Sequence, residues 1–462
     1  MADLVGVQST TPVSHAPPPP ARSDPVGRAV ERIEAALDEG FTDWDVGHGD
    51  LMDARAALDG LTPAQQSAVF SRLSDETLGH WLGEINGVRG GLSADEKRDF
   101  HNHLAENLDA TQLVRVMNNT RFVGDGEALG AAIGRAGGRT AVEFVDRMGE
   151  SLNGRTRVGN FTTTEDVVAR VVGNLDRPAE IDAALGALTP AQRESLGTNT
   201  FRSGGESPEA YNQLYAAVAR SSSVGTRTEF FGYAAKSSQE LRDAVKMPFS
   251  GQDFPALTPF YNAMTGLIRT DPRGMINQMA LRDVGMGHLT NYLEIAVIRG
   301  DTRLIGQLGA QVRRGEPIPG ANQTDSARFA HDYDRDGNNE DFRNAVRSGY
   351  FTGAAMAAAS NVDADAEKQR ALSVSLLTGG ASTAAAAFPV GGQIAVGIGG
   401  IVTQQVAEAV GDKASGDRQD FFGAMHEAGM PRNARGELPT GEARAQFIAA
   451  VSEVMNGHAM DR

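Results

Sequence analysis

Apolar residues recur along the chain at intervals of three and four, which is the spacing of one helical face. The run with Leu104, Leu108, Leu113, Val114 and Met117 is a clear example. Strict alternation of apolar and polar residues, typical of half-buried strands, is scarce. The pattern therefore predicts an all-α protein with helices of about 8 to 20 residues.

Helix starts carry a recurring signal. Residues 62–65 and 189–192 both read Thr-Pro-Ala-Gln, and residues 93–96 and 162–165 begin with a hydroxyl residue and end in Glu. A hydroxyl side chain followed three positions later by Gln or Glu forms a capping box, and proline is favoured at the first helical position. We expect a helix to begin at each of these four places.

The chain also contains an internal duplication. Residues 108–112 resemble residues 188–192, which lie 80 positions later, and residues 131–144 resemble residues 216–230 at offsets of 85 to 88. Small loop insertions between helices that keep their order explain this drift. The duplication predicts a helical repeat array, in which each unit buries its apolar face on the next. Chance similarity between Ala-rich helices is the alternative.

Gly and Pro punctuation divides the chain into five parts. We expect a disordered Pro-rich leader (residues 1–28), a helical repeat body (29–245), a second helical region with an Asp-rich loop (246–348), a Gly/Ala-rich helical hairpin (349–412), and a C-terminal linker and helix (413–462). The leader lacks a basic segment followed by an apolar one, so it does not resemble a Sec signal peptide. It is compatible with export by a non-Sec route.

The composition excludes several classes of function. Lys and Arg number 43 against 59 Asp and Glu, a net charge of −16, which argues against nucleic acid as the primary partner. The chain has no cysteine, and this excludes disulfides, zinc–thiolate sites and thiol nucleophiles. Aromatic residues make up 6% of the chain, so Ala, Leu, Val and Ile must fill a core of thin helical layers.

Residues 371–407 form an uncharged stretch between Arg370 and Glu408. Pro389 divides this stretch into two halves of 18 residues. Each half is about 27 Å long as a helix, close to the thickness of a bilayer's hydrocarbon core. Because a central proline favours a turn between two helices, the sequence predicts a helical hairpin.

Small residues recur at every fourth position of this hairpin, a spacing that lets helix backbones approach closely. The candidates for helix packing or membrane contact are Gly379, Pro389, Gly391, Ala395 and Gly399. Glycine in a helix interior costs about 1 kcal/mol, so an isolated helix would be unstable. Three interpretations stay open: burial inside a helical bundle, conditional membrane insertion and a constitutive membrane anchor.

Asp332, Asp334 and Asp336 stand at alternate positions directly before a glycine. Oxygen ligands at positions 1, 3 and 5 open a calcium-binding loop. The twelfth position, which carries a bidentate Glu in such loops, is Arg343 here, and two carboxylates at positions 340 and 341 are the nearby substitutes. The three Asp residues are a candidate calcium site, and a solvated acidic turn is the alternative.

Motifs for catalysis are not convincing. His101-Asn102-His103 spells a nuclease-like triplet, but residues two apart on a helix point to nearly opposite faces, so we expect a surface His pair. The Gly-rich runs have no Gly-Lys-Ser/Thr, and no Gly-x-Ser-x-Gly or His-Glu-x-x-His is present in a convincing context. No residue is a candidate for catalysis or cofactor binding, with calcium as the one cofactor in view, and the sequence favours a non-enzymatic role.

Four blocks carry a family resemblance: residues 92–99, 108–113, 267–274 and 350–354, the last leading into the Gly/Ala-rich stretch. They resemble, in the same order, the large helical N-terminal module found ahead of toxin domains in polymorphic-toxin-like secreted proteins of proteobacteria. The resemblance covers roughly residues 60–410. In that family the variable activity follows the Gly/Ala-rich segment. Here about 50 residues remain there, too few for most toxin folds.

The resemblance implies a secreted or delivered helical module. We expect a non-enzymatic effector or toxin-family delivery module for virulence or competition, cytoplasmic before export and membrane-active through residues 371–407. Its partners would be a protein or a membrane, with an export chaperone or a cognate immunity protein as candidates, and no nucleic acid. The alternative is a soluble helical scaffold that binds a partner protein through its repeat surface.

Overall fold

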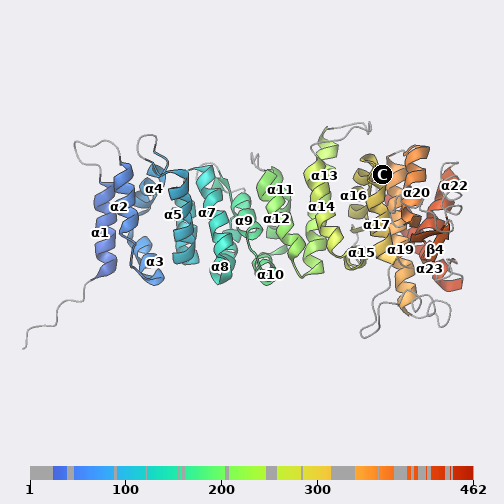
Figure 1. Ribbon diagram of the computed structural model, residues 1–462, viewed down its shortest axis with the longest axis horizontal. Helices are drawn as coiled ribbons and strands as arrows, with labels where there is room; N and C mark the ends of the chain where they lie inside the picture. Colours follow the sequence, from blue (N-terminus) through green and yellow to red (C-terminus); the bar gives the residue numbers. More distant parts are fainter. Residues whose placement is uncertain are drawn as a thin grey trace, which may run out of the picture. The chain divides into compact units, whose positions relative to one another are not determined.

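The protein forms two compact units, Met1–Gln112 (unit 1) and Leu113–Arg462 (unit 2). The computed structural model describes residues 24–38, 46–87, 91–120, 122–152, 157–158, 162–202, 208–245, 257–281, 285–313, 339–362, 364–378, 393–396, 400–403, 413, 418–431, 438 and 441–460. In Figure 1 the elements are labelled along the chain.

Unit 1 consists of short helices around an aromatic cluster. The ring centroids of Phe70 and Trp81 lie 5.8 Å apart, and those of Trp81 and Phe100 lie 5.3 Å apart. All three side chains are fully buried. The helices are α1 (Pro25–Leu37), α2 (His48–Ala56), α3 (Pro63–Arg72), α4 (Asp75–Glu84) and α5 (Ala94–Asn107). Helix α1 contacts α2, α3 and α4, and α3 contacts α5.

The predicted helix starts agree closely with the structure. Thr62 caps α3 and Ser93 caps α5, each with a complete capping box. Helix α11 begins at Pro190, and α9 begins at Thr164, directly after the short strand that contains Thr162. Helix α1 begins at Pro25, within the segment that we expected to be a disordered leader.

Unit 2 begins inside α6 (Ala110–Asn119) and continues as a series of helices to the last described residues. Its helices are α7 (Val123–Ala136), α8 (Gly138–Gly149), α9 (Thr164–Gly173), α10 (Pro178–Ala187), α11 (Pro190–Arg202), α12 (Pro208–Arg220), α13 (Val224–Val245), α14 (Thr258–Thr270), α15 (Pro272–Ala280), α16 (Gly285–Ile298), α17 (Thr302–Arg313), α19 (Asn339–Asn361), α20 (Ala366–Thr378), α22 (Arg418–Gly429) and α23 (Gly441–Met460).

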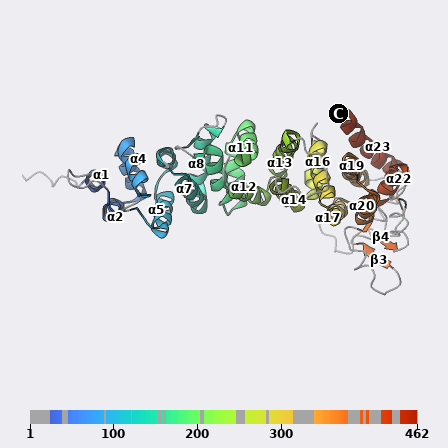
Figure 2. The same cartoon turned by 90° about the horizontal axis from the view of Figure 1, so that it is seen from above.

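The helices of unit 2 lie in two rows, which Figure 2 shows from above. One row contains α7, α9, α12 and α14, and each of these helices contacts the next. The other row contains α8, α11, α13, α16 and α19, in which α11 contacts α13, α13 contacts α16, and α16 contacts α19. Because these helices pack mainly on the next helix of their row, the fold is an all-α helical repeat array, as the sequence predicts.

Several side chains that join helices in the first part of unit 2 are separated by 43 residues. Arg170 bonds Glu127 and Gln213, each 43 residues away, and Gln192 bonds Gly149 at the same separation. Two such steps cover 86 residues, which falls within the offsets of 85 to 88 for the duplicated block 131–144. The duplication therefore relates α7 to α12 and α8 to α13, two steps along each row. The sequence offset is twice the structural period.

The structure contradicts the predicted helical hairpin in part of its length. Residues Ala366–Thr378 form α20, but Gln393–Val396 and Gly400–Thr403 form the antiparallel strands β3 and β4, with Ala395 paired to Ile401. Ile394, Val396, Ile401 and Val402 are β-branched, and such residues favour strands over helices. Arg157–Val158 and Thr162–Thr163 form a second ribbon, β1 and β2.

The residues after the Gly/Ala-rich stretch belong to unit 2. Helix α22 contacts α19 and α20, and α23 packs along α19. Helix α19 runs continuously from Asn339 to Asn361, across the boundary that we placed after residue 348.

Candidate functional site

Most of the predicted site residues lie outside the described residues. This applies to the candidate calcium ligands Asp332, Asp334 and Asp336, and to Gly379, Pro389, Gly391 and Gly399 of the predicted hairpin. Ala395 is described, and it lies in β3 instead of a helix. Calcium binding at residues 332–336 therefore stays a prediction.

The described part of the chain was also searched for membrane-spanning helices and for metal sites. None of its helices is both long and apolar enough to cross a membrane. Within the same residues, no three side chains of His, Asp or Glu lie close enough together to hold a metal ion.

The prediction of a surface His pair at residues 101 and 103 is wrong for His101. Its side chain is 3% exposed, and its Nδ1 has no hydrogen-bond partner. The ring lies against Phe100, with a centroid distance of 6.3 Å. Burial and the nearby Lys97 ammonium lower the pKa of His101 to about 4. Helical spacing correctly predicts that the two His side chains lie on different faces of α5. It cannot tell which of these faces is buried against other helices.

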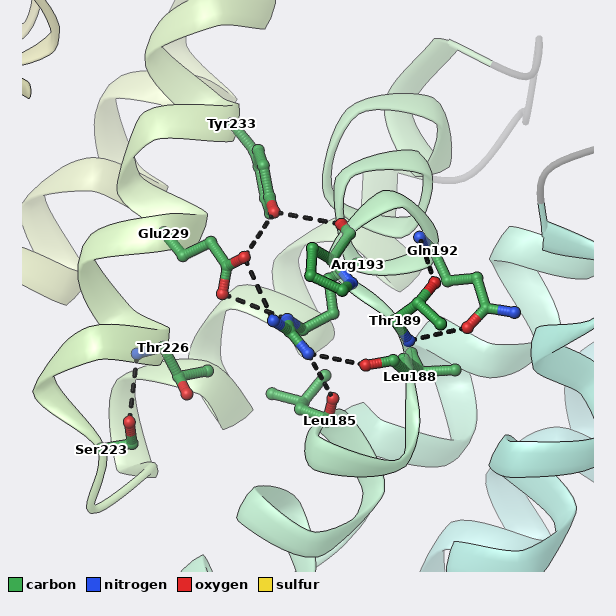
Figure 3. A network of polar contacts seen from close by, with 10 residues as sticks. Leu185, Leu188, Thr189, Gln192, Arg193, Ser223, Thr226, Glu229 and Tyr233 are labelled. Carbon is green, nitrogen blue, oxygen red and sulfur yellow. Dashed lines mark hydrogen bonds and ion pairs between the residues drawn. The ribbon is translucent and has the colours of Figure 1, made fainter. Parts of the chain in front are cut away.

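The most elaborate polar site in unit 2 joins α10, α11 and α13, and Figure 3 shows it from close by. Arg193 of α11 forms a two-point contact with Glu229 of α13, with Nε–Oε2 at 3.1 Å and Nη2–Oε1 at 3.3 Å. Its Nη1 also donates to the carbonyl oxygens of Leu188 (2.6 Å) and Leu185 (3.3 Å). The guanidinium thus closes the carboxyl end of α10 and holds α13 at the same time. We call Arg193, Glu229 and Tyr233 the arginine clamp.

Tyr233 completes the arginine clamp on α13. Its hydroxyl donates to Glu229 Oε1 at 2.9 Å and lies 3.4 Å from the Pro190 carbonyl oxygen. Burial and the negative charge of Glu229 raise the pKa of this phenol above its ordinary value. Tyr233 is therefore a neutral hydrogen-bond donor at physiological pH. Because Arg193 and Glu229 are both 19% exposed, the pair is well shielded from water.

The capping box of α11 extends the same site to α8. Gln192 Oε1 accepts from the Thr189 backbone N–H at 2.7 Å, and Gln192 Nε2 donates to the Gly149 carbonyl oxygen at 2.8 Å. The carbonyl of Gly149 is at the carboxyl end of α8, where the last turn of a helix lacks intrahelical donors. One Gln therefore begins one helix and closes another.

Arg170 of α9 plays an equivalent role in the other row. Its side chain is 7% exposed and forms ion pairs with Glu127 of α7 (2.9 Å) and Glu209 of α12 (3.2 Å). Its Nη1 also donates to Gln213 of α12 at 3.3 Å. A single buried guanidinium thus bridges three successive helices.

A third arginine connects the array to its C-terminal part. Arg242 of α13 contacts Asn291 of α16 and pairs with Glu294 of α16 at 2.8 Å. Glu294, 8% exposed, also accepts from Asn361 of α19 at 2.6 Å. Buried charges of this kind must be paired and hydrogen-bonded, because an isolated buried charge is very costly.

Glycines supply the close contacts between the rows' helices. A Cβ added at Gly134 of α7 would meet the Val171 carbonyl oxygen of α9 and would lie 2.7 Å from Asn174 Cβ. A Cβ at Gly173 of α9 would lie 2.7 Å from Gln213 Cβ of α12. Close packing of helices through glycine thus occurs within the array, whereas the packing predicted for residues 371–407 stays a prediction.

The arrangement can hold helices in register, and its buried polar groups satisfy one another across helix boundaries. Sequence reasoning missed the three arginines. A usable signal exists for one of them, because Arg193 directly follows a Thr-Pro-Ala-Gln capping box. The partners Glu127, Glu229 and Glu294 lie 36 to 52 residues from their arginines, and no local pattern identifies them.

Searches for similar proteins gave no match to a family model, to a curated protein or to a solved structure.

Proposed function

We propose that this protein is a non-enzymatic helical-repeat scaffold that binds a partner protein along its array. The observation that supports the proposal is the two-row packing of unit 2, in which buried arginines join successive helices. Repeat arrays of this type present extended surfaces for partner binding. The net charge of −16 favours a partner with a basic surface.

The two rows offer different surfaces to a partner. In the row of α12 and α14, Asn212, Ala216 and Asn262 are exposed and uncharged. In the other row, α13 exposes Lys236 and Gln239. Each row therefore has a position where a large side chain can be introduced without disturbing the core.

The experiment begins with affinity purification of the tagged full-length protein from its source cells, followed by reconstitution with the purified candidate partner. Isothermal titration calorimetry then compares the wild type with Ala216→Arg in α12 and with Gln239→Arg in α13. We expect one variant to weaken binding by about tenfold, or 1.4 kcal/mol, and the other to bind like the wild type. Failure to find a stoichiometric partner, or wild-type affinity in both variants, would contradict the proposal.

We also propose that the scaffold is a secreted delivery module, as the resemblance over residues 60–410 implies. The packing of α22 and α23 onto α19 and α20 supports this, since it makes the residues after the Gly/Ala-rich stretch a part of the helical unit. The test is immunodetection of the tagged chain in culture supernatant, with a cytoplasmic enzyme as the lysis control. Retention of the chain inside intact cells under all growth conditions would argue against it.

Membrane activity of residues 371–407 is a separable part of this second proposal. Liposome flotation and dye release with the wild type and a Gly399→Asp variant test it directly. We expect the added carboxylate to weaken both signals, because a charge in the hydrocarbon region costs about 3 kcal/mol. Absence of binding and leakage by the wild type at neutral and acidic pH would remove the membrane part and leave the scaffold proposal intact.

A further inference from the structure

Helix α23 lies against α19 through a close approach of the two backbones. A Cβ added at Gly349 of α19 would lie 2.5 Å from the Phe447 carbonyl oxygen, and one at Gly353 would lie 3.0 Å from the Val451 carbonyl oxygen. The buried residues of α23 form one stripe, Phe447, Ala450, Val451 and Val454. Residues between them are exposed, so α23 is an amphipathic helix with its apolar stripe on the body of unit 2.

His426 of α22 lies at the edge of this contact. Its imidazole meets the fully buried Phe447 ring of α23 edge to face, with a centroid distance of 6.1 Å and an interplanar angle of 87°. The Tyr350 hydroxyl of α19 donates to the Glu453 carboxylate of α23 at 2.9 Å, at the exposed rim. The ring contact between His426 and Phe447 thus joins α22 to α23, beside the apolar stripe that packs on α19.

The charges around His426 disfavour its protonation. Burial and the guanidinium of Arg444, one turn before Phe447 on α23, both lower the pKa of His426. Glu427, its neighbour on α22, pairs with Lys413 at 3.7 Å. The other described charged side chains on helices that contact α22 are Arg347 of α19, which bonds Asn277, and Arg313 of α17, which donates to the Ala428 carbonyl oxygen of α22 at 3.2 Å. Helix α20 adds Glu367, Lys368 and Arg370. Among the charged side chains, Arg444 is the one that lowers the pKa of His426.

We propose that α23 is an acid-releasable helix, packed on α19 beside the neutral His426 imidazole of α22 and released when that ring gains a proton. The protonated ring would sit half-buried beside Phe447 and close to the positive charge of Arg444. A histidine that resists protonation when α23 is docked binds its proton more readily when α23 is released. Docking must therefore weaken as the pH falls below 6.5, the ordinary pKa of histidine. Release uncovers the apolar stripe of α23 and the glycine face of α19. The device would make a surface of the scaffold available in acidic surroundings.

The test is hydrogen exchange by mass spectrometry on the full-length protein at pH 7.5 and pH 5.0, with labelling times corrected for the intrinsic pH effect. Peptides from α23 are compared with peptides from the buried helix α16. We expect the opening equilibrium constant of α23 to be larger at pH 5.0 than at pH 7.5. Once the pH lies below the pKa of His426 in the docked state, the increase is about tenfold for each pH unit by which docking lowers that pKa. Exchange in α16 should stay unchanged.

Two variants and one control decide the mechanism. His426→Phe should abolish the pH dependence in α23, because it keeps an aromatic contact and cannot be protonated. Arg444→Glu lies on an exposed position and should shift release to lower pH, because it supplies a counter-charge to the imidazolium. His101→Phe, in unit 1, should leave the response of α23 unchanged.

Three results would overturn the proposal. The first is equal exchange of α23 at the two pH values. The second is equal opening of α16 and α23 at pH 5.0, which would mean general unfolding. The third is an unchanged release pH in Arg444→Glu, which decides the matter even if His426→Phe does not fold.

Discussion

The same five-residue arrangement occurs once in each unit, with different consequences. Residues 62–66 of unit 1 and residues 189–193 of unit 2 both begin with Thr-Pro-Ala-Gln, and both form a capping box. The fifth residue is Gln66 in the first and Arg193 in the second. Each donates to backbone carbonyls five and eight residues earlier in the chain. The local geometry is therefore equivalent, and the long-range contacts are not.

The difference lies in how far the fifth side chain reaches. Gln66 is 3% exposed, and its amide nitrogen ends at the two carbonyls, at 3.4 and 3.3 Å. The guanidinium of Arg193 makes the same contacts and continues to Glu229 on another helix. Arginine has five donors in a planar fork, so it can close one helix end and pair with a carboxylate at the same time. One substitution thus separates a local helix stop from a connection between repeats.

Replacing Arg193 should have the largest effect of any change in this comparison. Arg193→Met leaves the Glu229 carboxylate buried without its partner, and loss of one member of such a pair costs about 3 to 5 kcal/mol. Gln66→Met is the matched control in unit 1 and should cost about 1 to 2 kcal/mol, because it removes weak hydrogen bonds between neutral groups. Urea unfolding followed by circular dichroism measures both. Equal losses in the free energy of unfolding of the two variants would mean that the ion pair between Arg193 and Glu229 does not stabilise the fold.

The next largest difference between the units should be the loss of stability of unit 1 in acid. The pKa of His101 is lowered to about 4 in the folded protein, so the folded unit 1 binds this proton less readily than the unfolded chain. The neutral His101 contributes fully to the free energy of unfolding above pH 6.5. This contribution falls as the pH drops from 6.5 to 4, and below pH 4 about 3 kcal/mol has been lost. The direction is the same for His103, whose pKa is lowered first by burial and then by the Arg55 charge.

Tryptophan fluorescence reports this acid effect selectively. Both tryptophans, Trp44 and Trp81, belong to unit 1, and Trp81 is part of the cluster beside His101 through Phe100. We expect the urea midpoint seen by fluorescence to fall between pH 7 and pH 4.5 in the wild type and to fall much less in His101→Phe. A wild-type pH dependence that survives in His101→Phe would assign the effect to other groups.

Glycine positions should distinguish contacts between repeats from ordinary helix interiors. Gly134→Ala places a methyl group against the Val171 carbonyl oxygen and 2.7 Å from Asn174 Cβ, so α7 and α9 must move apart, at a cost of about 1 to 3 kcal/mol. Gly186→Ala in α10 has open space around the new methyl group and should stabilise the protein by about 0.5 to 1 kcal/mol. Thermal unfolding compares the two. A stabilising Gly134→Ala would show that this helix contact is loose in solution.

The sequence predicts the local features of this fold well. Helical periodicity, the capping boxes and the repeat are carried by residues a few positions apart, or by whole blocks that resemble one another. The structure contains the periodicity, the repeat and the boxes at residues 62–65, 93–96 and 189–192, whereas Thr162 of the fourth box lies in β2. The arginines of the array were not predicted, because Arg170 and Arg242 meet their partners only after the helices have packed. The strands at residues 393–396 and 400–403 were missed for another reason: the pattern of small residues at fourfold spacing gave no weight to the five β-branched residues in them.

The smallest effect tests whether the capping box is independent of its surroundings. Thr62 and Thr189 accept from the N–H of the following Gln at the same distance, 3.3 Å. If the cap acts only on its own helix, Thr62→Ala and Thr189→Ala should each cost about 1 kcal/mol, and Ser at either position should restore most of the loss. The measurement is urea unfolding, with fluorescence for unit 1 and circular dichroism for unit 2. A larger loss for Thr189→Ala would mean that the cap also positions Gln192 on Gly149 and Arg193 on Glu229, so that a local helix start would itself be part of the connection between repeats.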